Sequence, residues 1–478
     1  MASLDTYPPV HARRVRPDTG PTDRRRLAAA LLSSTIPGLG QAFNRRLRPA
    51  LWFALPSLTL VLLALILFRV WTPARIAATI ITPSTLAAVM ILNGLVLLWR
   101  LVAVGHAFAD SRFRLAPGRG AIAGFLLALI WVAAPHAVGG YYGYLANEAF
   151  ASIFQDRGAS DPGGGIAGQP QPSPLNPEDD LPSPGPSPVP GERINVLLMG
   201  IDSGPHRNHA LTDTLIVVSL DADGRTVSML SIPRDIVDVP LGDGRTFAPK
   251  INSLLGYANR NKDEFPEGGT RALQQAVGAL LGVPIHYYSK IDLGGFVEVV
   301  DAVGGIDVNV KRALSDPNYG GYGVGPGWSI AAGKRHLDGK NALAYARIRK
   351  SVGESDFTRA ERQQQVLIAI RDKAVKNNLL LSLPGLLEAL AGTVRTDVPD
   401  DRLPELAALA EEIGGDRTLQ VVIRGNMLRS GGPSHPYGSV QIPNLKRIRD
   451  MAKYVFPAPG VTPAWPPPKA SPAASPSG

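Results

Sequence analysis

The sequence of 478 residues contains no cysteine. This absence excludes disulfides, thiolate nucleophiles and cysteine-bound zinc. The histidines show no HxxxH or similar ligand spacing, so a zinc site is not expected either; those compared are His206, His209, His286, His336 and His435. The chain also lacks a Gly-x-Ser-x-Gly elbow and a P-loop, which argues against the serine hydrolases and nucleotide hydrolases that carry those motifs.

Lysine and acidic residues are scarce in the first 120 residues, which hold 15 Arg, no Lys and 4 Asp. The whole chain has a formal net charge of +9, so the remaining residues, with 34 basic and 36 acidic side chains, have a balance of −2. The basic part is also very apolar, and positive loops beside apolar segments are typical of the cytoplasmic side of membrane proteins. A nucleic-acid partner is therefore not expected.

Three apolar segments, at 49–68, 76–99 and 121–143, have roughly the 20 residues that a bilayer requires. The loop between the last two is rich in arginine, and residues 1–26 form a basic tail without a cleavable signal pattern. We therefore expect the tail and this loop to be cytoplasmic. Three crossings would place everything after about residue 145 outside the membrane, which predicts a multi-pass protein with an extracytoplasmic domain.

The membrane region as a whole spans 27–145. Its first part, 27–43, is apolar but short, and it contains Pro37–Gly38–Leu39–Gly40. A fourth crossing there would reverse the topology or leave Arg45, Arg46 and Arg48 outside. We interpret this part as an interfacial or re-entrant piece.

A proline-rich linker is predicted at 157–191, where ten prolines lie from Pro162 to Pro190. Such chain is extended, at about 3.1 Å per residue, and holds a domain away from the membrane. One globular domain follows at 192–456. The Pro/Ala/Ser-rich tail, 457–478, is expected to be disordered.

Strands and helices are mixed within this domain. Ile194–Met199 is a continuous apolar run, typical of a central strand, and Leu215–Leu220 with Thr226–Ile232 flank a hairpin turn. The remaining pattern predicts strands at 306–310 and 419–423 and helices at 271–281, 358–376, 386–390 and 403–413. The fold class is therefore α/β, built around one sheet.

Four arginines and a run of glutamines lie close together in the sequence. If residues 346–350 are extended, Arg347 and Arg349 point to the same side. On the helix 358–376, which would begin with a Thr358-x-x-Glu361 capping box, Arg359, Arg362 and Gln363 share one face. Its first turn is free to face an anionic ligand, which a helix N-terminus favours. The alternative is that these arginines are solvated surface residues.

Polar residues also follow several strands. They are Asp202, Asp213, the pair Arg234–Asp235, Lys250 and Asn252. Strand ends are where the sites of α/β proteins usually lie, and two carboxylates with loop oxygens suit a hard cation such as Mg²⁺. Each residue alone is more often a turn residue, a cap or part of a surface ion pair.

In combination these motifs resemble the LytR–CpsA–Psr family of bacterial cell-wall glycopolymer ligases. The resemblance covers about residues 190–375 and runs, in the family's order, through NVLLMGIDS, LTDTLIVVSL, VSMLSIPRD, KIN, LLGVPIHYYSKIDLGGFVEVVDAVGGIDVNV, LDGKNALAYARIR and DFTRAERQQQV. It implies an α/β/α-type sandwich with an apolar groove for a polyprenyl tail, held outside a bacterial cell membrane. The usual member has one membrane span, whereas this chain is predicted to have three.

The resemblance also implies roles for residues. Matching the family's motifs, Asp202 and Asp213 are the expected magnesium ligands, and the expected phosphate-binding residues are Arg234, Arg347, Arg349 and Gln363. Arg359, Arg362, Lys250 and Asn252 are further candidates for substrate binding. Many members have Arg two residues before the second Asp, where this chain has Leu211; Arg207, in the preceding loop, is a possible substitute.

The implied reaction is phosphoryl transfer, in which positioning and charge stabilisation dominate. A peptidoglycan hydroxyl would attack a polyprenyl-pyrophosphate-linked glycopolymer and release polyprenyl phosphate, with Arg234, Arg347 and Arg349 at the reacting phosphates and Asp235 or Asp213 as the proton acceptor. Two alternatives remain open: hydrolysis of the same pyrophosphate, and a non-catalytic protein that binds lipid-linked glycan. The sequence does not name the polymer.

Overall fold

The computed structural model describes residues 21–80, 82–110, 116–153, 186–189, 191–202, 211–321, 324–376, 389, 393–413 and 417–467. The chain forms two compact units, Met1–Trp71 with Ser84–Tyr144 and Thr72–Pro83 with Leu145–Gly478, which are considered separately. Most of the predicted basic tail, linker and helix 386–390 lie outside the described residues, as do Arg207 and the chain after residue 467.

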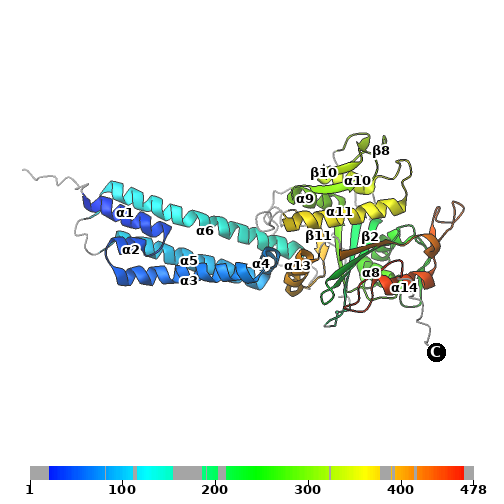
Figure 1. Cartoon of the computed structure of the whole chain (residues 1–478), viewed down its shortest axis with the longest axis horizontal. Coiled ribbons are helices and arrows are strands. Elements are labelled where there is room, and N and C mark those ends of the chain that lie inside the picture. The colour runs from blue at the N-terminus through cyan, green and yellow to red at the C-terminus, as the bar shows by residue number, and fades with distance from the viewer. Residues whose placement is uncertain are drawn as a thin grey trace, which may run out of the picture. The chain divides into compact units, whose positions relative to one another are not determined.

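The first unit is helical (Figure 1). Its elements are α1 (Pro21–Thr35), α2 (Leu39–Phe43), α3 (Leu47–Val70), α5 (Pro83–Phe108) and the larger part of α6 (Arg119–Ile153). Among the described residues, three helices are long and apolar enough to cross a membrane: Leu47–Val70, Pro83–Phe108 and Arg119–Ala151.

The predicted second span, 76–99, has the wrong limits. Residues 76–80 belong to a separate short helix, α4 (Pro73–Ile80), and α5 begins only at Pro83. Proline is favoured in the first turn of a helix, because that turn needs no N–H donor there and the φ angle of proline is already helical. The apolar run then continues past Arg100 as far as Phe108.

The segment predicted as interfacial, 27–43, is a broken helix. Gly38 lies between α1 and α2 with a φ angle of 100°, and a Cβ atom there would be 2.4 Å from the Ala50 carbonyl oxygen. The side chains of Gln41 and Asn44 donate hydrogen bonds to the carbonyl oxygens of α5, at Ala103 (2.8 Å) and Ala107 (3.0 Å). The two short helices are thereby fixed to α5, and neither is a candidate span.

A six-stranded sheet forms the centre of the second unit, in the order β11-β6-β1-β2-β3-β12. The strands are β1 (Ile194–Asp202), β2 (Leu211–Asp221), β3 (Thr226–Ser231), β6 (Tyr287–Asp292), β11 (Val394–Thr396) and β12 (Thr418–Val422). β1, β2 and β3 are antiparallel, as the hairpin signal predicts, whereas β6 pairs with β1 and β12 pairs with β3 in parallel.

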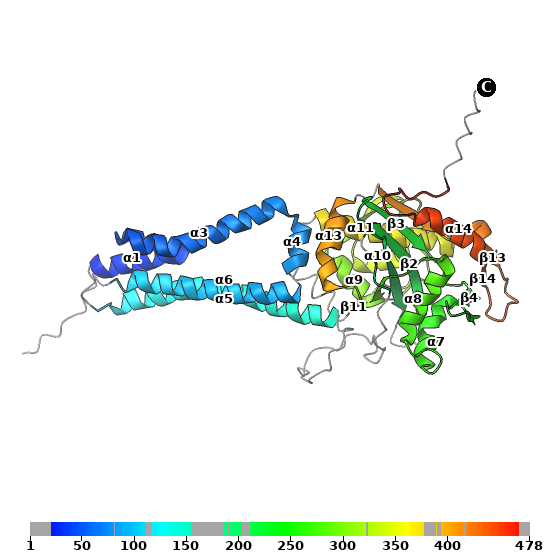
Figure 2. The same cartoon turned by 90° about the horizontal axis from the view of Figure 1, so that it is seen from below.

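Helices cover both faces of this sheet (Figure 2). One face packs on α7 (Leu254–Arg260), α8 (Gly268–Leu281) and α14 (Leu445–Val455); the other faces α9 (Leu293–Ala302), α10 (Gly339–Arg347), α11 (Asp356–Lys376) and α13 (Leu403–Glu412). The α/β prediction is therefore confirmed for this unit.

Smaller elements complete the unit. The short strands are β4 (Val239–Pro240), β5 (Thr246–Phe247), β7 (Ile306–Val310), β8 (Leu314–Asp316), β9 (Trp328–Ile330), β10 (Gly333–Leu337), β13 (Leu428–Ser430) and β14 (Gln441–Pro443), and the 3-10 turns are η1 (Ile251–Ser253), η2 (Asp400–Arg402) and η4 (Gly425–Met427). They form four two-stranded sheets among the described residues. β7, predicted as a strand, pairs with β10 rather than with the central sheet.

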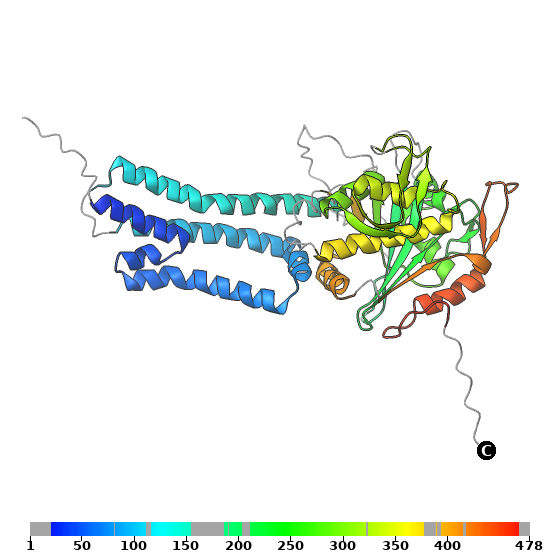
Figure 3. The same cartoon turned by 45° about the horizontal axis from the view of Figure 1, so that its top comes forward.

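The two faces of the central strands are buried to different extents. Leu197 and Val217 are fully buried toward α8. Leu198 and Val218, which point to the face of α9–α11 because strand residues alternate, are only partly buried. Their cross-strand partners on this face, Ile216 and Val196, are buried, so the partial exposure is confined to single positions. α11 lies across the strands on this side (Figure 3, yellow).

A β-bulge interrupts the pairing of β1 with β2. Gly200 pairs with Thr214 and Ile201 pairs with Thr212, so Asp213 is one extra residue in β2. Thr212 faces α7 and donates a hydrogen bond to the Asn252 carbonyl oxygen (3.2 Å). The bulge turns Asp213 to the opposite face, the same face as Asp202.

The predicted start of α11 lies two residues too late. The helix begins at Asp356, and its capping box is formed by Ser355 and Thr358, not by Thr358 and Glu361. The Thr358 N–H donates to the Ser355 hydroxyl (3.2 Å), and the Ser355 N–H donates to the Thr358 hydroxyl (2.9 Å). Two orphan N–H groups are satisfied reciprocally, as in the usual capping box.

The predicted disordered tail is ordered in its first part. Residues 457–467 are described, and the Ala464 N–H donates to the Tyr454 carbonyl oxygen (3.1 Å). Trp465 packs against the α8–α14 core and lies 6.4 Å from the ring of Tyr454. One aromatic anchor in an otherwise Pro/Ala/Ser-rich segment explains the difference.

Candidate active site

Two carboxylates at the ends of the central strands each bind an arginine. Asp202, the last residue of β1, accepts an ion pair from Arg347 at 3.0 Å, and Asp213 accepts one from Arg234 at 2.5 Å. Asp202 is almost fully buried, whereas Asp213 and Arg234 are partly accessible. Because the bulge places both carboxylates on one face, the two arginines approach from the same side of the sheet.

The Arg234 side of the site is held by the segment after β3. The Asp235 carboxylate lies between the Lys250 ammonium (2.7 Å) and the Arg234 guanidinium (3.8 Å). The Asn252 N–H donates to the Arg234 carbonyl oxygen (3.3 Å), so the predicted Lys250–Asn252 segment fixes the backbone beneath Arg234. Burial acts to lower the pKa of Arg234, but the neighbouring Asp213 carboxylate raises it overall.

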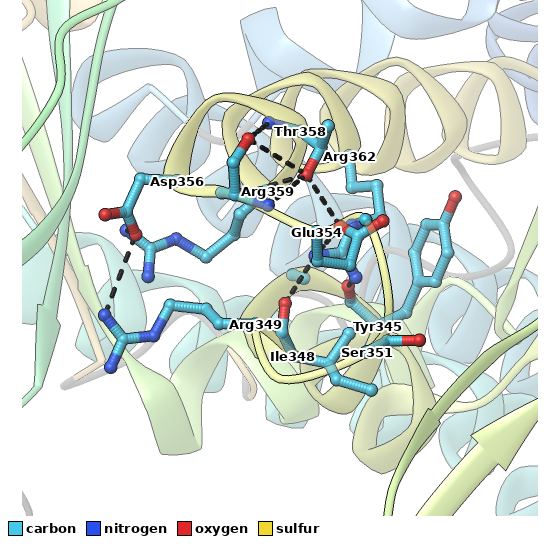
Figure 4. Close-up of polar contacts among 12 residues, drawn as sticks. Tyr345, Ile348, Arg349, Ser351, Glu354, Asp356, Thr358, Arg359 and Arg362 are labelled. Atoms are coloured by element: carbon cyan, nitrogen blue, oxygen red, sulfur yellow. Dashed lines mark hydrogen bonds and ion pairs between the residues drawn. The ribbon is translucent and has the colours of Figure 1, made fainter.

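Arg347 is the last residue of a helix, so the expectation that 346–350 is extended is wrong. α10 runs to Arg347, and Ile348 ends it with a φ angle of −55° and a ψ angle of 135°. Arg349 follows two residues later and extends toward Asp356, 3.7 Å away, where Arg359 also binds at 2.9 Å (Figure 4). The helix end and the loop after it therefore direct the two arginines to two different carboxylates, Asp202 and Asp356.

Arg359 lies at the centre of this arrangement and is only 6% exposed. Burial lowers its pKa to about 10; the Asp356 carboxylate opposes that shift, and the positive charges of Arg234 and Arg349 add to it. Arg349 and Arg359 meet at one carboxylate, that of Asp356, so their guanidinium groups lie close together. An anion placed beside them would relieve their mutual repulsion.

Arg362 does not face this cluster, contrary to the expectation that the first turn of α11 is open to a ligand. It is 7% exposed and binds the Glu354 carboxylate at 2.9 Å. It also donates to the carbonyl oxygens of Tyr345 (2.7 Å) and Ile348 (2.5 Å), at the end of α10 (Figure 4). Arg362 therefore holds the backbone that carries Arg347 and Arg349.

Glu354 is the residue that the sequence analysis missed. Its side chain is 3% exposed and binds Arg362, Arg312 and the Thr358 hydroxyl. Burial acts to raise the pKa of Glu354, but its bonds to Arg312 and Thr358 and the charge of Arg362 lower it overall. An acidic residue between two arginine pairs, at 354 and again at 356, was the available signal.

Two further predicted residues lie near the cluster. Gln363 is partly buried and contacts the Ala346 carbonyl oxygen at 3.4 Å, which places it beside the end of α10. Leu211 pairs with Asp202 across β1 and β2 and is partly exposed on the same face. An arginine at that position would therefore point toward Asp202, whereas leucine leaves the face apolar there.

The donor set suits magnesium only if a substrate contributes. Among the described residues, no group of three or more His, Asp or Glu side chains could hold a metal ion. Asp202 and Asp213 supply two carboxylates on one face, and Mg²⁺ is commonly held by one or two carboxylates together with substrate phosphates and water. The residues present therefore fit a magnesium ion that arrives with a phosphorylated ligand.

A sheet with paired carboxylates and converging arginines at its strand ends defines an anion-binding α/β domain. A model of the LytR_cpsA_psr family matches residues 177–450, more than half of the chain. The chain belongs to the LytR–CpsA–Psr family.

Curated relatives support this membership. The teichoic acid transferase TagV of Bacillus subtilis is 32% identical over 265 residues, which cover 54% of this chain and 63% of TagV. TagU of Enterococcus faecalis is 31% identical over 265 residues, covering 55% of this chain and 79% of TagU. Both are described as polyisoprenyl-teichoic acid–peptidoglycan teichoic acid transferases. Among solved structures, B. subtilis TagV is similar at 28% identity and a TM-score of 0.45, covering 56% of this chain and 98% of TagV.

Proposed function

We propose that this protein is a phosphotransferase that attaches a polyprenyl-pyrophosphate-linked glycopolymer to peptidoglycan through a phosphodiester, releasing polyprenyl phosphate. The observation that carries the proposal is that Arg234 and Arg347 bind the two carboxylates on one face of the sheet, Asp213 and Asp202, while Arg349 and Arg359 meet at Asp356. Guanidinium groups are suited to bidentate binding of phosphate. The family membership and the transferase names of the relatives agree with it.

In this mechanism Arg234, Arg347 and Arg349 bind the pyrophosphate and stabilise the charge that develops on its oxygens. A peptidoglycan hydroxyl attacks the sugar-side phosphorus, a new P–O bond forms, and the bond to the bridging oxygen breaks. Polyprenyl phosphate leaves with that oxygen, and the hydroxyl proton passes to Asp213 or Asp235, the carboxylates that contact Arg234. Catalysis of this kind is mostly positioning and electrostatics.

Asp202 and Asp213 would hold magnesium, which supplies further charge neutralisation to the phosphates when bound. The polyprenyl tail would contact the partly exposed side chains of Leu198 and Val218. We further propose that the three apolar helices cross a bacterial cell membrane, with the domain outside; the arginine-rich loop and N-terminal part support this orientation. The polymer itself stays unassigned.

The decisive assay supplies purified full-length protein with a polyprenyl-pyrophosphate-linked saccharide, with and without peptidoglycan. We expect a phosphodiester-linked product and an equal amount of polyprenyl phosphate only when peptidoglycan is present. Equal release of polyprenyl phosphate without the acceptor would instead define a pyrophosphatase. Tight binding of the donor with neither release nor product would define a lipid-glycan-binding protein.

Magnesium dependence gives a second expected result. Calorimetric titration should detect little Mg²⁺ binding to the protein alone and clear binding once inorganic pyrophosphate is present, because two carboxylates leave most coordination positions to phosphate and water. Asp213→Asn should weaken this pyrophosphate-dependent binding, whereas Asp243→Asn, an exposed control, should not. Strong Mg²⁺ binding without pyrophosphate, or unchanged binding in Asp213→Asn, would contradict the assignment.

A further inference from the structure

One cavity in the described part of the second unit does not lie at the arginine cluster. It has a volume of about 900 Å³, which is at the upper end of the usual range for ligand sites. Thr358, Glu361 and Gln365 line it from α11, whereas Arg359 and Gln363 lie on another face of that helix and contact the arginine cluster and α10. None of the proposed phosphate ligands Arg234, Arg347 and Arg349 lines it.

Most polar groups in the lining are amides or paired charges. Gln420 and Asn426 line it with exposed carboxamides, and Gln365 accepts a hydrogen bond from the Tyr345 hydroxyl (2.7 Å). Of the four basic residues, Arg312 and Arg362 bind Glu354, and Arg424 binds Glu361 at 2.7 Å. Arg312 and Arg362 share one carboxylate, so the lining keeps a formal charge of +2, and its remaining polar groups are neutral donors and acceptors.

One aromatic side chain completes this lining. Trp465 is half-buried, and the Ala464–Tyr454 backbone bond and the packing of its ring fix it in place. A fixed indole presents an apolar face with little loss of conformational entropy. The C–H face of a pyranose ring packs on such a surface while its hydroxyl and acetamido groups bond to amides nearby.

The cavity also adjoins the proposed active site through shared structure. Gly353 and Glu354, in the loop between α10 and α11, line it, and the same loop carries Arg349 before them and Asp356 after them. Tyr345 and Arg362, which line the cavity too, bond to each other at the end of α10 that carries Arg347. A ligand in the cavity would therefore lie against the back of the arginine-bearing loop.

We propose that this cavity is a glycan-binding site that takes a stretch of uncharged saccharide chain, packed on Trp465 and hydrogen-bonded to Gln420 and Asn426. A glycan held there would lie against the loop 348–356, which carries Arg349. The assignment of this glycan as part of the peptidoglycan acceptor rests on the proposed transferase function. The proposal that the cavity binds a glycan does not.

The test measures binding to the purified full-length protein by calorimetry, with an N-acetylglucosamine tetrasaccharide as the neutral probe and poly(glycerol phosphate) as the charged one. We expect the tetrasaccharide to bind, and Trp465→Ala to weaken it about tenfold, since losing an aromatic anchor is costly. Gln420→Ala/Asn426→Ala, at two exposed positions, should weaken it severalfold. Preference for poly(glycerol phosphate) would assign the cavity to an anionic polymer and overturn the proposal.

Tyr437→Ala and Gln275→Ala are matched controls, because both residues are exposed and outside the cavity. Neither should change tetrasaccharide binding, and equal losses in controls and cavity variants would contradict the site. In the transfer assay, the cavity variants should raise the KM for the acceptor and leave the KM for the donor unchanged. Binding that depends on Trp465 in a protein without transferase activity would refute the proposed function but not the glycan site.

Discussion

Arg349→Ala is expected to reduce glycopolymer transfer by about 100- to 1,000-fold, the usual effect of removing one preorganised donor to developing charge. The guanidinium is about half exposed, and its ion pair with Asp356 is long, at 3.7 Å. An exposed pair of this kind contributes less than about 1 kcal/mol to folding. The variant should therefore lose activity with its melting temperature almost unchanged, which single-turnover transfer and thermal unfolding measure together.

Arg335→Ala is the matched control for this variant. Arg335 is an exposed arginine on β10 whose guanidinium donates to nearby carbonyl oxygens, including those of Ala331 and Ala332. It should transfer at the wild-type rate. Arg349→Lys should fall between wild type and alanine, because an ammonium keeps the charge but lacks the planar fork. Full activity of Arg349→Ala would exclude it from the phosphate site.

Glu354→Gln is expected to destabilise the second unit by about 3 kcal/mol, because it leaves the Arg362 guanidinium buried without its counter-charge. The side chains of both residues are less than a tenth exposed, at 3% and 8%. Arg362 also holds the end of α10, so the transfer rate should fall as well. The unfolding transition measured in urea reports the first effect.

The stability difference between wild type and Glu354→Gln should depend on pH. Burial alone would raise the pKa of Glu354, but Arg312, Thr358 and Arg362 lower it overall. A carboxylate with a depressed pKa stabilises the fold above its unfolded pKa, about 4.3, and loses that contribution as the pH falls through the folded value. The difference in unfolding free energy between wild type and Glu354→Gln should be largest at pH 7 and should decrease below about pH 4.5.

Glu361→Gln is the control that tests whether the loss of stability in Glu354→Gln arises from burial of the ion pair and not from the loss of a charge alone. Glu361 lies on the same helix and pairs with Arg424 at 2.7 Å, but both side chains are exposed, at 36% and 57%. Glu361→Gln should lower the free energy of unfolding by less than about 1 kcal/mol. Equal losses in the two variants would mean that Glu354 acts only as a surface charge.

Much of the sheet was predictable because its signals are local. The apolar run at 194–199, the turn at 221–224 and the strands at 306–310 and 419–423 all correspond to strands or turns in the structure. The helix of Arg347 was also recoverable: Asp338 accepts the N–H of Asn341 as an N-cap, and an alanine-rich run follows it. Placing Arg347 on a strand overlooked these signals.

The roles within the arginine cluster were not predictable from spacing. Arg359 and Arg362 are three residues apart on one helix and both are buried, yet one lies among arginines and the other binds backbone carbonyls of α10. The difference arises from partners distant in sequence, such as Asp213 and Tyr345. Spacing identifies which side chains share a face, whereas tertiary contacts decide what that face meets.

The single extra residue in β2 has a consequence for comparing sequences of this family. Strict alternation counted back from Leu215 would send Asp213 into the apolar core opposite Ile201, and only the added residue turns its carboxylate toward Arg234. Deleting Thr212 would restore that alternation and would therefore remove the acidic pair, although both aspartates would be kept. In an alignment, a one-position gap here changes the chemistry of the strand end more than most substitutions would.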